Sequence, residues 1–520
     1  MQALLENIRS VAGDENVITD ALECEFFAQD VYSKSWNAAA VVAPGDKNEL
    51  AAVVRAATES GVAVVARGGG MSYTGGYVPA EENTILLDMS RMNRVLEINR
   101  EDMYVTVEAG TTWSDLYEAL KEYGLRTPYW GTLSGLYATV GGSLSQNAIF
   151  FGSGRFGTAA DSVIGMEVVL ADGTILNTGS ASQINASPFF RHFGPDLTGL
   201  FTADCGALGI KATASFRLMP ELPVQAFGSF AFDDYTSMVK AMCEISRNDV
   251  VTECFGFDPY LQQQRMKRDR LANDVKKLGG VLKAAGGVGK AIKAGAKMAV
   301  AGRGFMDDVK WSFHVMTEAH TEASADANLR KVREISTRSG GRELADSIPR
   351  LVRANPFGPV NNMLGPAGER WVPVHALVPH SKAIQTLEQV EALFSEHSQL
   401  LEKHDIHTGY LLAIISTHCF VIEPVFFWPD ELMEIHRRSV QPAHLKHLTE
   451  FPQNLEAREA VAKVRGHLVE LLTDIGGVHL QLGKSYRYRE GLQPETFAFV
   501  QSIKKLVDPD NRLNPGNLGL

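Results

Sequence analysis

The chain has 520 residues, of which 50 are Lys or Arg and 61 are Asp or Glu, so its formal net charge is −11. At roughly 100–200 residues per domain, this length predicts about two to four domains. The hydrophobic fraction of 45% and the charged fraction of 21% are typical of a globular protein and exclude wholesale disorder, collagen and coiled coil. The acidic balance argues against a nucleic-acid-binding protein, which normally carries a basic excess.

Targeting signals and cysteine usage predict a cytoplasmic protein. The first twenty residues contain no basic run followed by an apolar run, so we expect no signal peptide. No stretch reaches the roughly 18 uninterrupted apolar residues that a membrane-spanning helix needs. The five cysteines are odd in number and form no Cys-X-X-Cys motif, which favours a reducing compartment and predicts no disulfide framework.

A βαβ-like pattern opens the chain after residue 40. Asp46 and Glu49 have the spacing of a capping box and predict a helix start, and Gly61 stands where that helix ends. Short apolar runs predict strands at 62–66, 83–89, 103–110 and 162–173, the last with a hairpin signal at Ala171-Asp172-Gly173.

Three glycine-rich stretches each lie beside strand-like sequence. The first, RGGGMSYTGG at 67–76, has five glycines in ten positions, which permits positive φ and lets successive backbone N–H groups converge on a pyrophosphate. The second and third cover 138–157 and 196–210. The first stretch has neither the spacing of the dinucleotide fingerprint nor that of the P-loop. Together they predict a large cofactor held mainly by backbone groups.

The order of these motifs resembles the vanillyl-alcohol oxidase/para-cresol methylhydroxylase (PCMH-type) flavoprotein family. The resemblance covers roughly residues 37–220 and 455–520 and rests on RGGG-S-TGG, VEAG, ATVGGSLSQN, GRFG, GMEVVLADG, DLTGLF, GALGI and the final VDPDNRLNPGNL. It implies an α+β fold in which FAD binds between two α+β subdomains and a larger α+β cap domain holds the substrate.

The same resemblance implies a domain division. An N-terminal helical lead-in (1–36) precedes the FAD-binding domain (37–220), which is followed by the cap (221–455) and by a C-terminal segment (456–520) that returns to the FAD domain.

The resemblance also assigns the cofactor-binding residues. They are Arg67, Gly68, Gly69, Gly70, Met71, Ser72, Thr74, Gly75 and Gly76 for the pyrophosphate loop; Gly141, Gly142, Ser145 and Asn147 along the flavin and ribityl chain; and Gly206, Ile210 and Asn514 to complete the cleft. Family members whose flavin is tethered through this loop have His where this chain has Met71. The expected cofactor is therefore non-covalent FAD, although a tether from a cap residue stays open.

The C-terminal segment resembles two branches of the family. GGVHLQLGKSYRYREGLQPE is similar to the tail of the D-2-hydroxy-acid (glycolate, D-lactate) dehydrogenases, but Val478 stands where that branch has a metal-binding Glu. Likewise Val425 stands seven residues after His418, where a second metal-binding His is expected, so we predict no catalytic metal. Tyr486-Arg487 resembles the Tyr-Arg pair of the 4-alkylphenol oxidisers.

Hydride transfer from a carbon atom to flavin N5 requires a base, or a cation that stabilises an oxyanion, near the attached oxygen. His479 and His418 are the candidate bases, although His418 also fits a buried core histidine. The candidates for holding a carboxylate or a phenolate are Lys484, Tyr486, Arg487 and Arg489. The alternative interpretation of YRYR is an edge strand with exposed arginines. Tyr129 and Trp130 either line the substrate pocket or fill core.

The sequence thus predicts an FAD-dependent oxidoreductase, a dehydrogenase rather than an oxidase, with a 2-hydroxy acid as the preferred small-molecule substrate. The alternatives are oxidation of a 4-alkylphenol or benzylic alcohol, the redox-neutral alkyl transfer of alkylglycerone-phosphate synthase relatives, and a non-enzymatic flavin-binding scaffold.

A basic insert departs from the acidic average. Residues 265–303 carry eleven Lys or Arg against two Asp, and their apolar positions predict an amphipathic helix with a lysine face, interrupted by glycines. We expect residues 270–303 to contact an anionic membrane surface, which would place the protein peripherally on the inner face of a membrane beside a quinone or protein electron acceptor. A mobile lid, or a helix packed on the cap or on a second subunit of a homodimer, is the alternative.

Overall fold

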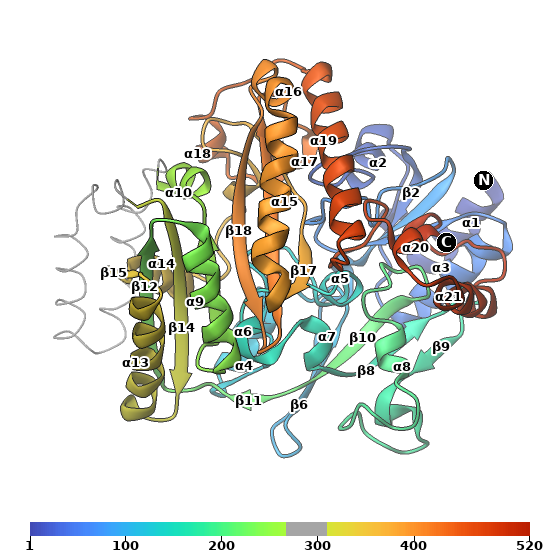
Figure 1. Cartoon of the computed structure of the whole chain (residues 1–520). Coiled ribbons are helices and arrows are strands. Elements are labelled where there is room, and N and C mark those ends of the chain that lie inside the picture. Colours follow the sequence, from blue (N-terminus) through green and yellow to red (C-terminus); the bar gives the residue numbers. More distant parts are fainter. Residues whose placement is uncertain (267–308) are drawn as a thin grey trace.

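The computed structural model describes residues 1–266 and 309–520, which contain both helices and sheets and confirm the predicted α+β class (Figure 1). Three large sheets organise the described residues. Two belong to the N-terminal half and the third belongs to the cap. The basic insert predicted at 265–303 lies outside the described residues from position 267 onward.

The first sheet has the strand order β1-β2-β4-β3, with β2, β4 and β3 parallel. Asp46 starts the crossover helix α3 as predicted, because its carboxylate accepts the N–H groups of Asn48 and Glu49, and Gly61 follows the helix with φ of +72°. The predicted helical lead-in also supplies a strand, β1, to this sheet. The elements are α1 (Gln2–Ala12), β1 (Val17–Ile18), α2 (Ala21–Phe27), β2 (Ala38–Val42), α3 (Lys47–Glu59), β3 (Val64–Arg67) and β4 (Thr84–Asp88).

The second sheet is antiparallel, with the order β5-β6-β10-β8-β9. The predicted hairpin at Asp172-Gly173 joins β8 to β9, with Gly173 at φ of +79°. The elements are β5 (Val95–Asn99), β6 (Tyr104–Glu108), α4 (Trp113–Lys121), β7 (Leu125–Arg126), α5 (Val140–Gln146), α6 (Ser153–Phe156), α7 (Ala159–Ser162), β8 (Val163–Val169), β9 (Ile175–Asn177), α8 (Leu197–Leu200), β10 (Ile210–Arg217) and β11 (Met219–Pro220).

The cap is built on an antiparallel sheet of order β15-β12-β14-β13-β18-β19-β16, with β17 paired to β19. Its strands are β12 (Val224–Phe232), β13 (Glu253–Phe257), β14 (Trp311–Ala319), β15 (Arg342–Leu344), β16 (Arg370–Pro373), β17 (Ala376–Pro379), β18 (His407–Ile415) and β19 (Cys419–Trp428). Its helices are α9 (Tyr235–Arg247), α10 (Pro259–Met266), α13 (Glu322–Arg338), α14 (Ser347–Ala354), α15 (Ala383–Glu396), α16 (Ser398–Lys403), α17 (Glu434–Ser439), α18 (Pro442–Leu445) and α19 (Leu455–Asp474).

The two faces of the cap sheet bury different partners. Helices α9, α13, α15 and α19 cover one face and share a core with strand residues such as Val315 and Phe426 (Figure 1). Because side chains alternate along a strand, their neighbours Met316 and Val425 point to the other face, where they pack with Trp130 of the FAD domain. The substrate cavity described below lies on this second face.

The C-terminal segment returns to the FAD domain later than the expected boundary at residue 456. Helix α19 packs in the cap core through residues such as Val461 and Leu468, since its apolar stripe faces α15 and α16. Val478 still pairs with Leu377 of the cap, and contact with the FAD domain begins at Gln481, whose N–H donates to the Gln146 carbonyl (2.8 Å); α20 (Tyr488–Gly491) and α21 (Pro494–Val507) follow. Figure 1 shows this red tail beside the blue N-terminal elements, in agreement with the hydrogen bond from the Val64 N–H to the Arg512 carbonyl (2.8 Å).

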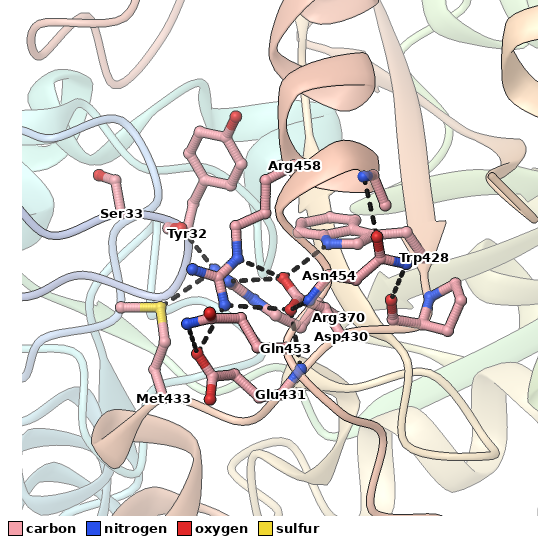
Figure 2. A network of polar contacts seen from close by, with 12 residues as sticks. Tyr32, Ser33, Arg370, Trp428, Asp430, Glu431, Met433, Gln453, Asn454 and Arg458 are labelled. Carbon is pink, nitrogen blue, oxygen red and sulfur yellow. Dashed lines mark hydrogen bonds and ion pairs between the residues drawn. The ribbon is translucent and has the colours of Figure 1, made fainter.

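A buried ionic network connects the cap to the lead-in (Figure 2). Asp430, which is fully buried, accepts hydrogen bonds from Arg458 (2.6 Å) and from the indole of Trp428 (3.1 Å). Arg370 lies 3.3 Å from the same carboxylate and also donates to the carbonyl of Tyr32 (2.5 Å). The network therefore fixes the start of α19 and the lead-in at one point of the cap sheet.

Among the described residues, no helix is both long and apolar enough to cross a membrane.

Candidate active site

A cleft enclosing about 920 Å³ lies between the two N-terminal subdomains. Its walls come from the loop after β3, from α5 and the loop before it, and from the segment that enters β10. The lining residues are Ala66, Gly68, Gly69, Gly70, Met71, Ser72, Gly76, Tyr77, Met89, Ala109, Thr132, Ser134, Ala138, Thr139, Gly141, Gly142, Ser143, Ser145, Gln146, Ala148, Cys205, Gly206, Gly209, Ile210, Lys211 and Gln481. All three predicted glycine-rich stretches therefore meet at one cleft.

Close packing explains why the first loop needs glycine. A Cβ atom on Gly69 would lie 1.8 Å from the Tyr137 carbonyl oxygen, and a Cβ on Gly76 would lie 2.3 Å from Nε2 of Gln146. A larger residue at position 69 would push the loop away from the segment that leads into α5, and one at position 76 would displace the Gln146 side chain at the end of that helix. The glycines thus bring the two sides of the cleft together.

The cleft fits a pyrophosphate-bearing cofactor. Within the described residues, the backbone N–H groups of Gly69, Gly70 and Met71 have no hydrogen-bond acceptor, so they are available to phosphate oxygens. Gly206, with φ of +74°, has only Nδ2 of Asn514 within 4 Å of its would-be Cβ, which leaves space for a ligand on that side. FAD would supply the anionic and flat aromatic parts that these walls accommodate.

Some predicted cofactor residues support the cleft rather than line it. Arg67 is buried against the rings of Phe26, Phe27 and Tyr77, and Asn147 ends α5 in the left-handed conformation. Thr74 and Gly75 continue the loop outside the lining residues, and the Gly75 N–H donates to buried Asp30 (2.6 Å).

Asn514 connects the tail to the cleft. Its Nδ2 donates to the carbonyl oxygens of Gly76 (2.7 Å) and Cys205 (2.6 Å), and its Oδ1 accepts a hydrogen bond from Lys484 Nζ (3.1 Å). Three segments far apart in the sequence are therefore held together by one amide.

A second cavity of about 1110 Å³ lies between the FAD domain and the cap sheet. It shares Met71, Thr132, Ser134 and Gln481 with the cofactor cleft, so these four residues mark where the two spaces meet. The remaining lining residues are Val31, Tyr73, Leu133, Ile149, Phe150, Ser153, Gly154, Glu253, Cys254, Phe255, Val360, Asn362, Met363, Trp371, Leu411, Ala413, Ile414 and Glu423. Among these described lining residues there is no Lys, Arg or His.

Tyr73 is the polar side chain beside the junction. Nε2 of Gln481 donates to its hydroxyl (3.0 Å), and the ring packs edge-on against Trp371. Burial, together with the charge of Glu423, raises the pKa of Tyr73 well above its usual value. The phenol therefore stays protonated and is able to donate a hydrogen bond to a ligand.

Glu253 is a second polar group of the cavity wall. Its carboxylate accepts the Gly152 N–H (2.8 Å) and the Thr252 hydroxyl (2.5 Å), and only 3% of the residue is exposed. Burial and the neighbouring charge of Glu318 raise the pKa of Glu253 to about 7.

The structure brings two of the predicted catalytic residues together, His479 and Tyr486, whose rings stack with centroids 4.1 Å apart. Nδ1 of His479 contacts the His375 carbonyl oxygen (2.7 Å), and the Tyr486 hydroxyl accepts the His375 N–H (2.9 Å). Burial lowers the pKa of His375 to about 3 and also lowers that of His479, so both imidazoles are neutral. This cluster lies behind Tyr73, whose ring is edge-on to His375, and not among the described lining residues of either space.

The other predicted catalytic and substrate residues lie elsewhere. His418 is exposed at the turn between β18 and β19 and lines a separate surface depression with Arg155 and Arg217, because the hairpin tip points away from the cleft. Arg487 lies 3.8 Å from Glu470.

Arg489 and Lys484 also lie outside the described lining of the substrate cavity. Arg489 is exposed and covers the ring of Phe497. Residues Tyr488–Gly491 form helix α20, so the edge-strand interpretation of YRYR is wrong. Lys484 is not among the described lining residues of either space: its Nζ donates to the carbonyls of Gly75 and Val78, and burial lowers its pKa to about 8.

Tyr129 and Trp130 fill core and do not line the cavity. Tyr129 packs edge-on against Trp113, and Trp130 stacks on Phe151 and under Arg353.

Sequence reasoning missed the cap residues of the cavity. Glu253, Phe255 and Glu423 face it because they occupy alternate positions of β13 and β19. The sequence signal that could have identified them is a carboxylate within an otherwise apolar strand, at a position whose side chain faces the cavity. In the described part of the chain, no group of three or more His, Cys, Asp or Glu could hold a metal ion.

Comparison of the sequence with known protein families supports FAD as the ligand of this cleft. Residues 38–179 match the family described as "FAD binding domain", and residues 449–518 match "FAD linked oxidases, C-terminal domain". The fold and the cleft thus define an FAD-binding flavoprotein. The chain thus contains an FAD-binding domain and the C-terminal domain of FAD-linked oxidases, in agreement with the resemblance that the motif order predicted.

The curated relatives match only part of this chain and part of their own length. The glycolate oxidase subunit GlcD of Bacillus subtilis is 35% identical over 182 residues, which are 35% of this chain and 37% of that protein. The mitochondrial D-lactate dehydrogenase [cytochrome] of Arabidopsis thaliana is 31% identical over 260 residues, which are 48% of this chain and 44% of that protein. The chain therefore spans less than half the length of either relative.

Solved structures match over the whole chain. Substrate-bound p-cresol methylhydroxylase has a TM-score of 0.75 at 18% identity, covering 100% of this chain and 96% of that one. An alkyldihydroxyacetonephosphate synthase has a TM-score of 0.70 at 16% identity, covering 99% and 86%. At these identities the likeness shows the fold alone.

Proposed function

We propose that the chain is an FAD-dependent oxidoreductase that oxidises a hydroxyl-bearing organic substrate with a largely apolar body. The observation that carries this proposal is the cavity of about 1110 Å³ that meets the cofactor cleft at Met71, Thr132, Ser134 and Gln481. FAD, when bound, supplies an acceptor for the hydride that leaves the substrate carbon. Met71 favours a cofactor held without a covalent bond through this loop.

Tyr73 and Glu423 are the proposed residues for the proton chemistry. Tyr73 is held by Gln481 and stays protonated, so its hydroxyl donates a hydrogen bond to the reacting oxygen of the substrate. Glu423 lines the same cavity and is close enough to act electrostatically on Tyr73. Its carboxylate takes the proton that leaves the substrate hydroxyl.

A 2-hydroxy acid is the second candidate substrate. The described lining residues provide no cation for its carboxylate, which weighs against the preference drawn from the sequence. In its favour, the relatives are named for glycolate and D-lactate, and buried Arg465 has Nε and Nη2 without hydrogen-bond acceptors among the described residues. Arg465 is close enough to Tyr73 and Tyr486 to act on both electrostatically.

An anaerobic flavin-reduction screen tests the proposal. The FAD-loaded protein is mixed with arylalkyl and long-chain alcohols, with 4-alkylphenols and with 2-hydroxy acids, and bleaching of the visible flavin absorbance is recorded. We expect bleaching by alcohols with an apolar body. Bleaching by 2-hydroxy acids alone would establish the second candidate, and bleaching by none of the three would refute both. Hydrogen peroxide formed in air then distinguishes an oxidase from a dehydrogenase.

A further inference from the structure

A cluster of charges at the wall of the substrate cavity, buried except at Glu221, has one carboxylate more than it has cations. Among the described residues, Arg126 pairs with Glu318, and Arg353 pairs with both Glu318 (3.0 Å) and Glu221 (3.1 Å). Glu253, whose pKa responds to both Glu318 and Arg353, is the third carboxyl group. Two guanidinium groups therefore face three carboxyl groups.

Glu253 is the member of the cluster without a cation of its own. Within the part of the chain that the structure describes, no basic nitrogen lies within 4 Å of its carboxylate, whose hydrogen bonds come from the Gly152 N–H and the Thr252 hydroxyl. It is also the one member of this cluster that lines the cavity. A buried carboxylate without a counter-ion is costly, and a positive charge placed beside it removes that cost.

The other lining residues of the cavity also favour a positively charged ligand. Its other charged lining residue in the described chain is Glu423, and the walls are otherwise apolar or neutral. Apolar walls of low dielectric strengthen the attraction between a buried carboxylate and a cation. The same walls disfavour a ligand that carries a negative charge.

We infer that Glu253 is a substrate-binding residue that pairs with a cationic nitrogen of the substrate. This inference rests on the proposed function and narrows the substrate class to amino alcohols with an apolar body. Glu253 is not among the residues shared with the cofactor cleft, so the nitrogen and the reacting hydroxyl occupy different parts of the cavity.

Calorimetric titration with three matched probes tests the inference without turnover. The probes are 4-phenylbutylamine, 4-phenylbutan-1-ol and 4-phenylbutyrate, which share one apolar body and differ in charge. The FAD-loaded wild-type protein is expected to bind the amine about tenfold more tightly than the alcohol and to bind the acid most weakly. Tighter binding of the acid, or no preference for the amine, overturns the inference.

Two variants then assign the preference to a residue. Glu253→Gln keeps the size of the side chain and an oxygen for the Gly152 N–H, and is expected to reduce the amine preference to about one while leaving the alcohol affinity within about twofold. Glu244→Gln, on the outer face of α9 beside Arg338, is the matched control and should leave the preference intact. An unchanged preference in Glu253→Gln, or its loss in Glu423→Gln instead, overturns the assignment. The wild-type series remains decisive even where a variant does not fold.

The experiments distinguish failure of the proposed function from failure of the cation site at Glu253. A protein that prefers the amine but whose flavin no alcohol reduces refutes the proposed function and leaves the cation site. A protein that oxidises alcohols without preferring the amine refutes the cation site alone.

Discussion

The hydroxyl of Tyr73 lies 3.0 Å from Nε2 of Gln481, so the glycine loop of the FAD domain and the tail meet at the point where the cofactor cleft opens into the substrate cavity. The two residues are 408 positions apart in the sequence. Their contact places a phenolic donor beside the expected reaction centre.

Tyr73→Phe is expected to slow flavin reduction by about 10²–10³-fold, because it removes one hydrogen bond to the reacting oxygen. FAD affinity should not change, since Tyr73 lines the substrate cavity and not the cofactor cleft. Anaerobic stopped-flow spectroscopy measures the rate, and Tyr123→Phe, on an exposed side chain, is the control. A rate within about twofold of wild type would contradict the role of Tyr73.

Asn514→Ala is expected to weaken FAD binding and to lower the free energy of unfolding by about 1–3 kcal/mol, because it leaves buried hydrogen-bonding groups without partners. The affected groups are the Cys205 carbonyl, and in part the Gly76 carbonyl and Lys484 Nζ. Flavin fluorescence titration and urea unfolding measure the two effects. Asn7→Ala, on the exposed side of α1, should change neither quantity.

Asp430→Asn is expected to destabilise the protein by about 3–5 kcal/mol at neutral pH, because it leaves buried Arg370 without its full counter-charge. Burial alone would raise the pKa of Asp430, but hydrogen bonds from Arg458, the Asn454 N–H and Trp428 hold it below the usual value. A lowered folded pKa contributes stability above the unfolded value, about 3.9, which is lost as the pH falls through the folded pKa.

The difference between wild type and Asp430→Asn should therefore shrink as the pH falls below about 4, because the unfolded wild-type chain then binds a proton that the folded carboxylate takes up only at lower pH. Urea unfolding at several pH values measures it, with Asp326→Asn on the exposed face of α13 as control. A difference that persists at low pH would show that the charge of Asp430 is not what stabilises the network.

His436 predicts a second acid-sensitive contribution. Its Nδ1 accepts the Met433 N–H (3.0 Å) and its Nε2 contacts the Val31 carbonyl (3.1 Å), an arrangement that only the neutral ring satisfies. Burial, with the charge of Arg370, lowers its pKa to about 3. Between the unfolded pKa of about 6.5 and this value the unfolded chain binds one more proton, so stability falls with decreasing pH by about 1.4 kcal/mol per unit.

The variant His436→Gln should lose one proton of this pH dependence between about pH 6 and pH 4. The slope of the unfolding free energy against pH measures the number of protons, and His467→Gln, at an exposed position of α19, is the control. An unchanged slope in His436→Gln would contradict the assignment to this residue.

The sequence predicted the cofactor cleft better than the substrate cavity because the two are built differently. Gly69 and Gly76 stand in one short glycine-rich run, whose pattern is recognisable in the sequence although the groups they pack against, Tyr137 and Gln146, come from another segment. Glu253 and Glu423 each belong to an apolar strand, and only the register of the cap sheet brings them to one cavity. No short segment of sequence contains that register.

For the candidate catalytic residues of the C-terminal half, too, the sequence did not reveal which distant segments surround them. The sequence offers His479 and Tyr486 as separate candidates, and their rings stack, yet their common partner His375 comes from the cap and has no motif around it. Lys484 and His418 are candidates because of their basic side chains and because each lies in a stretch that resembles a family motif. Their surroundings, which are backbone carbonyls for Lys484 and a hairpin tip for His418, depend on contacts between distant segments.

The return of the tail sets an order of events during synthesis. All the glycines of the cleft have been translated once Gly209 leaves the ribosome, but the Val64 backbone still lacks its partners Arg512 and Asn514, and the carbonyls of Gly76 and Cys205 lack their amide. The whole cap must be made before these bonds can form. We therefore expect flavin capture to follow the synthesis of residues 512–514, and a nascent chain halted within the cap should emerge colourless.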